Sequence, residues 1–152
     1  MNYSIYTDGA CSNNGAESAV GGAAFVILRE DGSVFYQDYW KISNATNNIC
    51  EMLALSYACY VISDVLSLDD TVTLYTDSAY IINCNTEKWY KKWQENGWRN
   101  SKKEPVANRE LWERIIPYFK DSRFTFQKVK GHANCEWNNY VDKLAVRAKE
   151  EN

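Results

Sequence analysis

The first third of the chain combines strand-like segments with short turns. Segments 3–7, 23–28 and 34–42 are rich in β-branched and aromatic residues, and glycine-containing turns such as Asp31-Gly32 separate them. This arrangement is typical of consecutive antiparallel strands. In the third segment large side chains occupy both sets of alternating positions, so we expect both faces of the sheet to be partly covered. The pattern predicts a three-stranded antiparallel meander.

Helical and strand patterns alternate in the rest of the chain. Apolar residues recur at helical spacing from residue 49 to about 66, and a short apolar run at 72–76 predicts a fourth strand. The later predicted elements are a brief helix from Ser78, a helix over about 107–116 that Pro117 ends, a fifth strand over 123–129 and a last helix over about 138–149. Strands joined through helices pair in parallel. We therefore expect an α/β fold, with three antiparallel strands and then parallel strands in one mixed five-stranded sheet, and helices on both faces.

Length and composition limit the class of protein. The chain has 152 residues, of which 45% are apolar and 24% are charged. These values are typical of a globular domain, so we expect a single domain over residues 1–152 and exclude disordered and fibrous proteins. The apolar stretches are far shorter than the roughly 20 residues that cross a bilayer, and the N-terminus has no signal-peptide pattern. We therefore expect a soluble, cytoplasmic protein with no membrane partner.

The cysteines indicate neither a disulfide framework nor a zinc site. They are odd in number and form no C-x-x-C pair, lying at Cys11, Cys50, Cys59, Cys84 and Cys135. Reduced thiols, as in a cytosol, are the expectation.

Charge is distributed unevenly along the chain. The formal net charge is −3, which excludes a protein that holds nucleic acid by overall basicity. Segment 86–112 nevertheless contains seven basic and four acidic residues, so it carries +3 and the remainder carries −6. Its tryptophans Trp89, Trp93 and Trp98 are interleaved with basic residues, a mixture typical of surfaces that bind a sugar-phosphate backbone. Tryptophans can equally be core residues, and Trp89, Trp93 and Trp112 can pack a helical hairpin, so both interpretations can hold on different faces.

Four acidic residues lie where the chain is expected to turn or to form a helix. Asp8 ends the first predicted strand and Asp77 ends the fourth, while Glu51 starts the long helix and Asp142 lies in the last helix. Each acid also has a structural explanation. Asp8 and Asp77 can cap turns, Glu51 can form a capping box with Asn48, and Asp142 can be a solvated helix residue.

As a set, the acids point to a metal site. The carboxyl ends of neighbouring parallel strands face the crevice where open α/β sheets bind ligands, so Asp8 and Asp77 are expected to converge there with Glu51. Without a cation such carboxylates repel one another. Hard carboxylate oxygens favour Mg²⁺ or Mn²⁺ over zinc, and an all-carboxylate site is the kind that holds two metal ions for attack at phosphorus.

His132, the only histidine, follows the fifth predicted strand. A lone histidine can be structural rather than catalytic. Imidazole titrates near neutral pH, however, and a loop position suits proton transfer or a role in metal or product release. Asp142 lies ten residues later, so one loop connects both residues to the predicted site.

Five short motifs occur in the order found in one known family. They are Tyr6-Thr7-Asp8-Gly9, Thr46-Asn47-Asn48-x-x-Glu51, Thr76-Asp77-Ser78-x-Tyr80, Lys130-Gly131-His132-Ala133 and Asp142-x-Leu144-Ala145. Through these motifs the chain resembles ribonuclease H of type 1 over nearly its whole length. Segment 86–112 resembles the basic protrusion that bacterial members use to hold a hybrid. Five motifs in order, with fitting separations, are highly specific.

The resemblance implies a ribonuclease H-like fold and an endonuclease that cuts the RNA strand of an RNA/DNA hybrid, leaving 5′-phosphate and 3′-hydroxyl ends. By motif, Asp8, Glu51, Asp77 and Asp142 would bind two Mg²⁺ ions, with Mn²⁺ as the other candidate. One ion would activate the attacking water, and the other would stabilise the leaving 3′ oxygen. His132 would assist turnover.

The resemblance also suggests which residues contact the hybrid. They are Asn14, Thr46, Asn47 and Asn48 for its strands, Trp89 for a DNA sugar, and Lys91 and Lys92 within the basic protrusion. Discrimination would come from 2′-hydroxyl contacts and groove shape, with little base specificity. Ala79 departs from the family pattern, because many members carry a polar residue there that reads the hybrid.

Two alternative functions remain at this point. One is a non-catalytic nucleic-acid-binding module of the same fold, against which the four acids and His132 argue. The other is a different metal-dependent nuclease of the superfamily, which the basic protrusion disfavours. No protein partner is implied, and we expect a monomer. Because the protrusion mixes four acids with its seven bases, we predict weaker hybrid binding than a more basic relative would show.

Overall fold

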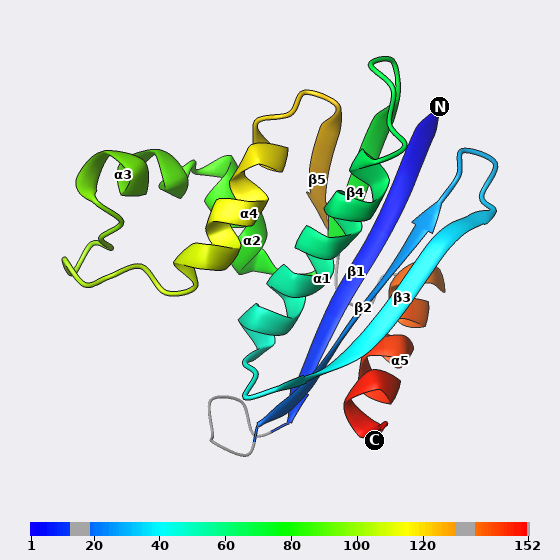
Figure 1. The fold of residues 1–152 in the computed structure, drawn as a ribbon, viewed down its shortest axis with the longest axis horizontal. Helices are drawn as coiled ribbons and strands as arrows, with labels where there is room; N and C mark the ends of the chain where they lie inside the picture. Colours follow the sequence, from blue (N-terminus) through cyan, green and yellow to red (C-terminus); the bar gives the residue numbers. More distant parts are fainter. Residues whose placement is uncertain (13–18, 130–135, 152) are drawn as a thin grey trace.

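The computed structural model describes residues 1–12, 19–129 and 136–151, which form a five-stranded sheet flanked by helices (Figure 1). The elements are β1 (Asn2–Ser12), β2 (Val20–Leu28), β3 (Val34–Ser43), α1 (Asn47–Ser63), β4 (Thr71–Thr76), α2 (Ala79–Thr86), α3 (Trp89–Asn96), α4 (Arg109–Phe119), β5 (Phe124–Lys128) and α5 (Glu136–Glu150). The strand order is β3-β2-β1-β4-β5, with β1 to β3 antiparallel and β4 and β5 parallel to β1. The predicted mixed sheet is confirmed. None of the helices in these ranges has the length and apolar character needed to cross a membrane.

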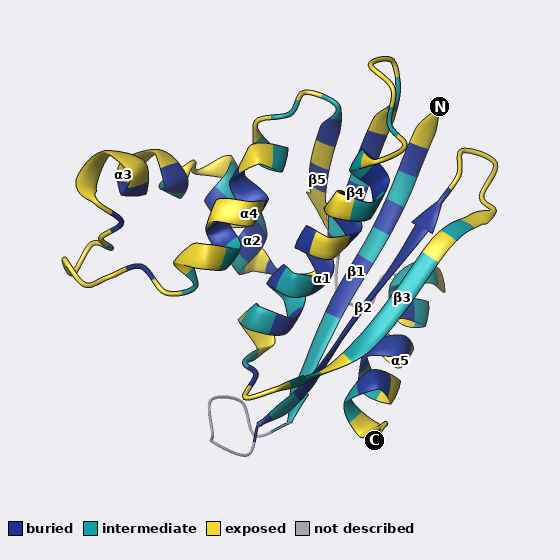
Figure 2. Cartoon of the chain, in the orientation of Figure 1, coloured by how far each residue is buried: buried dark blue, intermediate teal, exposed yellow. Residues whose placement is uncertain are grey.

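Helices cover both faces of the sheet, as predicted. Strand β2 is buried along nearly its whole length (Figure 2), and its alternate residues enter two separate clusters of buried side chains. Phe25 and Ile27 join the larger cluster, together with side chains of α1 and α4. Ala24 and Val26 face the opposite way and pack with Val141 and its neighbours on α5. Burial on both faces explains why β2 is apolar along its length rather than alternating.

Strand β1 is longer than the sequence pattern predicts. Its parallel pairing with β4 stops at Tyr6 opposite Tyr75, but its antiparallel pairing with β2 continues to Ser12. Asp8 therefore lies inside the strand, opposite Ala24, and the prediction that it ends the strand is wrong. The reason is that β2 continues to satisfy the backbone hydrogen bonds of β1 beyond the end of β4.

Pro117 does not end its helix, contrary to prediction. Helix α4 continues to Phe119. The proline removes one N–H donor at an exposed position, where water can satisfy the freed carbonyl. The ring of Phe119 lies 5.0 Å from that of Phe126 in β5, so packing on the sheet holds the last turn in place.

A helical segment projects from the body between α2 and α4 (Figure 1). It contains α3, a helix that the sequence analysis did not place as a separate element. Trp93 packs this segment against α4, because its ring centroid is 5.8 Å from that of Trp98 and 5.7 Å from that of Trp112. All three of these tryptophans are buried, so for them the interpretation as core residues is correct. Most of the remaining surface of α3 is exposed (Figure 2).

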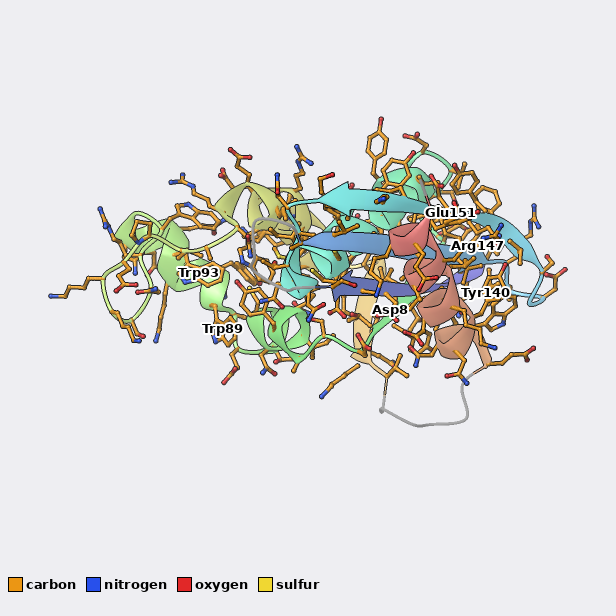
Figure 3. The ribbon with its side chains drawn as sticks, turned by 90° about the horizontal axis from the view of Figure 1, so that it is seen from below. Asp8, Trp89, Trp93, Tyr140, Arg147 and Glu151 are labelled. Carbon is orange, nitrogen blue, oxygen red and sulfur yellow. The ribbon has the colours of Figure 1, made fainter. Side chains whose placement is uncertain are left out.

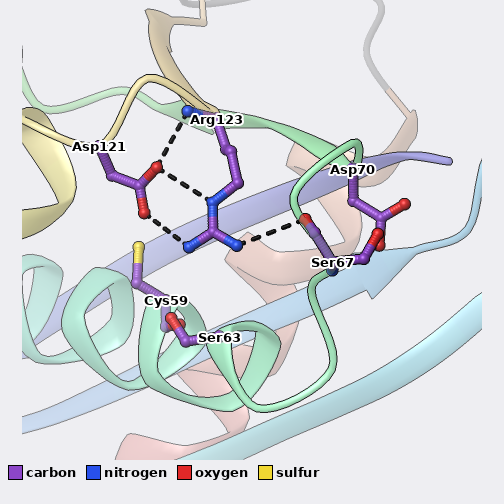
Figure 4. Close-up of polar contacts among 6 residues, drawn as sticks. All are labelled: Cys59, Ser63, Ser67, Asp70, Asp121 and Arg123. Atoms are coloured by element: carbon purple, nitrogen blue, oxygen red, sulfur yellow. Dashed lines mark hydrogen bonds and ion pairs between the residues drawn. The ribbon is translucent and has the colours of Figure 1, made fainter.

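Arg123 connects two loops at the amino ends of β4 and β5 (Figure 4). Its guanidinium donates to the carboxylate of Asp121 at 2.8 and 3.1 Å and to the carbonyl of Ser67 at 3.4 Å. Its backbone N–H also donates to Asp121, at 3.0 Å. Because Asp77 follows the opposite end of β4, these contacts hold the sheet together away from the acidic cluster.

Candidate active site

Three carboxyl groups from separate elements meet at one end of the sheet. Asp8 belongs to β1, Asp77 follows β4, and Glu51 lies in the second turn of α1. One oxygen from each lies within 4.8 Å of the other two. The parallel register, which pairs Tyr6 with Tyr75, brings Asp8 and Asp77 level with each other two residues further on. The structure therefore brings together three of the four acids that the sequence analysis singled out.

Asp142, the fourth acid, approaches from α5. Its carboxyl group lies near enough to that of Asp8 to contribute to raising the pKa of Asp8. Asp142 itself is exposed on α5, whereas Asp8 is only 5% exposed. The cluster thus has a buried floor formed by Asp8 and an exposed rim formed by Asp77 and Asp142.

Burial and repulsion destabilise the charged forms of the inner carboxyl groups. Burial is the main cause of the raised pKa of Asp8, and the negative charge of Asp77 raises it further. The N–H of Gly9 donates to Asp8 Oδ1 at 2.8 Å, which acts in the opposite direction. Burial also raises the pKa of Glu51, and contact with Asp77 adds to the effect. Binding of a cation would favour the ionised forms of both groups.

Two glycines allow the helices to approach the sheet closely enough to form this cluster. A Cβ atom on Gly9 would lie 2.7 Å from the backbone nitrogen of Glu51. A Cβ atom on Gly22 would meet the carbonyl oxygen of Ala145 and lie 2.8 Å from the nitrogen of Lys149. Gly9 of β1 therefore sets the distance of α1 from the sheet, and Gly22 of β2 sets that of α5.

The donor set of the cluster fits a hard divalent cation. All four acids offer carboxylate oxygens, the ligands that Mg²⁺ and Mn²⁺ prefer, and burial together with the neighbouring carboxyl groups raises the pKa of Asp8 and of Glu51, a cost of ionisation that a bound cation would offset. Oxygens within 4.8 Å of one another can share one ion or bridge two neighbouring ions.

Ser78 also belongs to the site, although the sequence analysis did not assign it a role. It is buried directly after Asp77 and lowers the pKa of the Glu51 carboxyl group, against the larger effect of burial. Ser78 lies in the motif Thr76-Asp77-Ser78, and its position before a predicted helix was the available signal.

The residues suggested for hybrid binding at the start of α1 surround Glu51. Thr46 is the N-cap of α1, and its hydroxyl accepts a hydrogen bond from the N–H of Ile49 at 3.1 Å. The capping box between Asn48 and Glu51 is therefore wrong, because Asn48 already lies within the helix. Asn47 and Asn48 are exposed on its first turn.

The aromatic and basic residues of the protrusion lie away from the acidic cluster. Figure 3 shows Trp89 and Trp93 on the projecting segment, whereas Asp8 lies in the body. Trp89 is half-buried, with its ring centroid 6.2 Å from those of Tyr80 and Trp93. Lys91 and Lys92 are exposed on α3. The structure thus separates the acidic cluster from a basic surface on the protrusion.

His132 and Asn14 lie outside the described residues, so their places relative to the cluster are not assigned. A hollow of about 810 Å³ lies elsewhere, between β3, α1 and α4, with Trp40, Tyr57 and Tyr118 among its lining residues. None of the four acids lines it. The acidic cluster, with Asp77 and Asp142 exposed at its rim, is therefore the candidate active site, because its carboxylates can hold a metal ion at the described surface.

Comparison with known proteins identifies the family. The family model described as RNase H matches residues 1–150. The protein "Ribonuclease H" of Clostridium botulinum is 39% identical over 147 residues, which cover 97% of this chain and 95% of that protein.

Solved structures agree with this assignment. LC9-RNase H1, described as a type 1 RNase H with the type 2 active-site motif, has a TM-score of 0.79 and 25% identity, covering 97% of this chain and 72% of that one. The foamy viral protease-reverse transcriptase, solved in complex with RNA/DNA hybrid, has a TM-score of 0.82 and 21% identity, covering 97% of this chain and 20% of that one, and shows a shared fold. The chain therefore belongs to the ribonuclease H family and is a nuclease, an enzyme of the hydrolase class.

Proposed function

We propose that the chain is an endonuclease that hydrolyses the RNA strand of RNA/DNA hybrids and leaves 5′-phosphate and 3′-hydroxyl ends. The observation that carries this proposal is the meeting of Asp8, Glu51 and Asp77 within 4.8 Å in a chain of the ribonuclease H family. The foamy viral reverse transcriptase bound to a hybrid, which shares the fold, adds support.

Asp8, Glu51, Asp77 and Asp142 would hold the divalent ions. When bound, two such ions supply activation of water and neutralisation of the charge that develops on the phosphate. Asp8 provides a buried carboxylate, while Asp77 and Asp142 are exposed, so that ions held by the cluster would be accessible to a phosphate of the substrate. We take Mg²⁺ as the natural ion and Mn²⁺ as a possible substitute, since both accept this donor set.

The hybrid would span the acidic cluster and the protrusion. Asn47 and Asn48, exposed beside Glu51, would contact its strands, with Thr46 and Asn14 near a DNA phosphate. On the protrusion, Trp89 would pack against a DNA sugar and Lys91 and Lys92 would attract phosphates. His132 would assist turnover by proton transfer or product release. Such contacts read strand type and shape rather than bases.

The test is cleavage of an RNA/DNA hybrid labelled at the RNA end, beside the same hybrid labelled at the DNA end. Single-stranded RNA, double-stranded RNA and double-stranded DNA are the other substrates. The proposal predicts cutting of the RNA strand of the hybrid alone, requiring Mg²⁺ or Mn²⁺ and abolished by EDTA. Tight binding of the hybrid without cutting in either metal would favour a non-catalytic binding module. Cutting of double-stranded DNA would favour another metal-dependent nuclease of the superfamily.

The molecule is proposed to act as a monomer in the cytoplasm, without a protein partner. Its small size and the short helices of the described ranges suit this proposal. Sedimentation analysis of the purified protein tests the oligomeric state directly.

A further inference from the structure

The hollow between β3, α1 and α4 is walled by aromatic residues. Its volume of about 810 Å³ lies within the range of about 300 to 1,000 Å³ that is typical of small-molecule sites. Trp40 comes from β3, Tyr57 and Tyr60 come from α1, and Tyr118 comes from α4. Tyr57 and Tyr60 are 40% and 60% exposed, so a ligand can reach these rings from solvent.

The rings of the hollow lie at angles to one another. The ring centroids of Trp40 and Tyr57 are 5.3 Å apart, and their planes cross at 65°. Both rings pack on the buried Phe25, with centroid distances of 6.1 and 5.6 Å, so the core holds them in place. Rings at such angles offer aromatic surface to more than one side of a bound group. The faces of aromatic rings attract cations, and tryptophan does so most strongly.

Charge in the hollow also favours a cation. The charged lining residues are Asp38, Glu113 and Arg114, which together carry −1. Glu113 already forms an ion pair with Arg109, at 3.1 Å. Asp38 accepts a hydrogen bond from the N–H of Tyr39 at 2.8 Å, but no lysine or arginine of the described ranges forms an ion pair with it. Its carboxylate is therefore available to a cation from outside the chain.

We propose that this hollow binds a small organic cation, of the alkylated ammonium class, against Trp40 and Asp38 of β3. Alkyl groups spread the positive charge over an apolar surface that fits aromatic rings, and quaternary ammonium groups are recognised in this way. Arg114 lies on α4, so that wall suits a hydroxyl or an anionic group of the same ligand. The site is separate from the proposed hydrolysis, because none of the four acids lines the hollow.

The experiment titrates choline into isotopically labelled protein at constant ionic strength, followed by nuclear magnetic resonance. Neohexyl alcohol, in which carbon replaces the quaternary nitrogen, is the neutral probe of the same shape. Choline should shift the indole N–H signal of Trp40 and the backbone N–H signal of Tyr57 until both saturate. The alcohol should bind about 10-fold more weakly, because it lacks the attraction to the rings and to the carboxylate. No saturable shift with choline, or equal binding of both probes, would overturn the proposal.

Asp38→Asn tests the charge of the β3 wall. It should weaken choline binding about 3-fold and leave binding of the alcohol unchanged. Asp69→Asn is the matched control, since it makes the same chemical change at an exposed position in the loop before β4. This control should bind choline as the wild-type protein does. Equal losses in the two variants, or no loss in Asp38→Asn, would overturn the proposed site.

Trp40→Leu tests the aromatic wall. It keeps an apolar side chain but removes the ring, so choline binding, followed at Tyr57, should fall about 3-fold or more. Should this variant fail to fold, Tyr60→Leu makes the same change at a side chain that is 60% exposed. Unchanged choline binding in the folded variant would overturn the role of the rings and with it the proposal.

Hybrid cleavage by Asp38→Asn shows whether the hollow is a separate site. We expect cleavage at the wild-type rate, because Asp38 lies outside the acidic cluster and the protrusion. A loss of cleavage would place the hollow within the surface that holds the hybrid and overturn a separate ligand site. Choline binding is measured without hybrid or metal, so failure of the wild-type protein to cut the hybrid would refute the proposed function alone.

Discussion

Burial and repulsion between carboxyl groups disfavour the ionised forms of Asp8 and Glu51 in the metal-free protein. Their pKa values rise to about 8 and about 9, mainly through burial. A carboxyl group whose pKa is raised by folding stabilises the fold while it is protonated, and this contribution is lost as pH rises from the unfolded pKa, near 4, through the folded pKa. The acids that suit the site to a cation therefore weaken the fold at alkaline pH.

We predict that the metal-free protein loses stability between about pH 5 and pH 9. The expected loss in free energy of unfolding is of the order of a few kcal/mol, since one pKa unit corresponds to about 1.4 kcal/mol. Thermal unfolding in EDTA across this range measures it. Asp77→Asn removes a charge that repels both groups, so the decline should be smaller in this variant. Mg²⁺ should raise Tm most at the alkaline end. A Tm that stays level or rises with pH in EDTA would contradict this account.

At the residue scale the sequence identified the acids but not their environments. Acidic residues at the predicted ends of strands could be identified, because the type of each side chain and its position in the pattern are known from the sequence. The choice of Thr46 over Asn48 as the cap of α1 was not, because several neighbouring residues can cap and the loop from β3 decides which one has the required backbone angles. The effect of Ser78 on Glu51 depends on the meeting of α1 with the end of β4, which spacing along the chain does not reveal.

Helix α5 depends on a close approach to the sheet at Gly22. We predict that Gly22→Ala lowers the free energy of unfolding by about 3 kcal/mol, because the new methyl group meets the backbone of α5 at Ala145 and Lys149. The displaced helix carries Asp142, so hybrid cleavage should fall as well. Chemical denaturation and cleavage measured on the same samples test both effects.

Gly32→Ala is the control for this substitution. A Cβ atom on Gly32 would meet nothing within 4 Å, and φ there is +88°, so the change adds backbone strain without a clash. Its expected effect is about 1 kcal/mol on stability and none on cleavage. If Gly22→Ala were no more destabilising than Gly32→Ala, the close packing of α5 against β2 would not be a major contribution to the free energy of unfolding.

At the element scale, the strands and the long helices could be predicted from periodicity, whereas tertiary contacts determine where they begin and end. The mixed sheet was predictable because short loops join the first three strands and helices join the rest. Strand β1 extends past Asp8 because it pairs with the long strand β2. Helix α4 continues past Pro117, where Phe119 packs against Phe126. Neither contact is visible in the local sequence pattern. Helix α3 was missed because its pattern mixes the buried aromatic residues Tyr90 and Trp93 with exposed lysines over a short length.

The charge distribution of the whole molecule predicts how hybrid binding responds to salt. An acidic body with a net charge of −6 carries a protrusion of +3, so few phosphates are neutralised on binding. We predict a shallower salt dependence than that of a more basic relative. Removing Lys91 and Lys92 together should reduce the slope of log Kd against log salt by about 2. Fluorescence anisotropy with a labelled hybrid in EDTA, which prevents cutting, measures the slope.

Arg29→Ala is the matched control for the lysines. Arg29 directly follows β2 in the hairpin to β3, at the end of the sheet away from the acidic cluster, and its removal deletes one positive charge. The slope should therefore stay at the wild-type value. If Arg29→Ala reduced the slope as much per charge as the removal of Lys91 and Lys92, overall charge rather than the protrusion would govern binding.

The central claim is that the four carboxylates form the metal site for cleavage of the RNA strand. Its most direct test is cleavage of an end-labelled RNA/DNA hybrid in Mg²⁺ by the wild-type protein, Asp77→Asn and Asp69→Asn. The two variants make the same chemical change, but Asp69 is exposed in the loop before β4, at the end of the sheet away from the cluster. We predict that Asp77→Asn still binds the hybrid but cuts it at least about 100-fold more slowly, while Asp69→Asn cuts at the wild-type rate. Wild-type cutting by Asp77→Asn, or undiminished cutting in EDTA, would contradict the account.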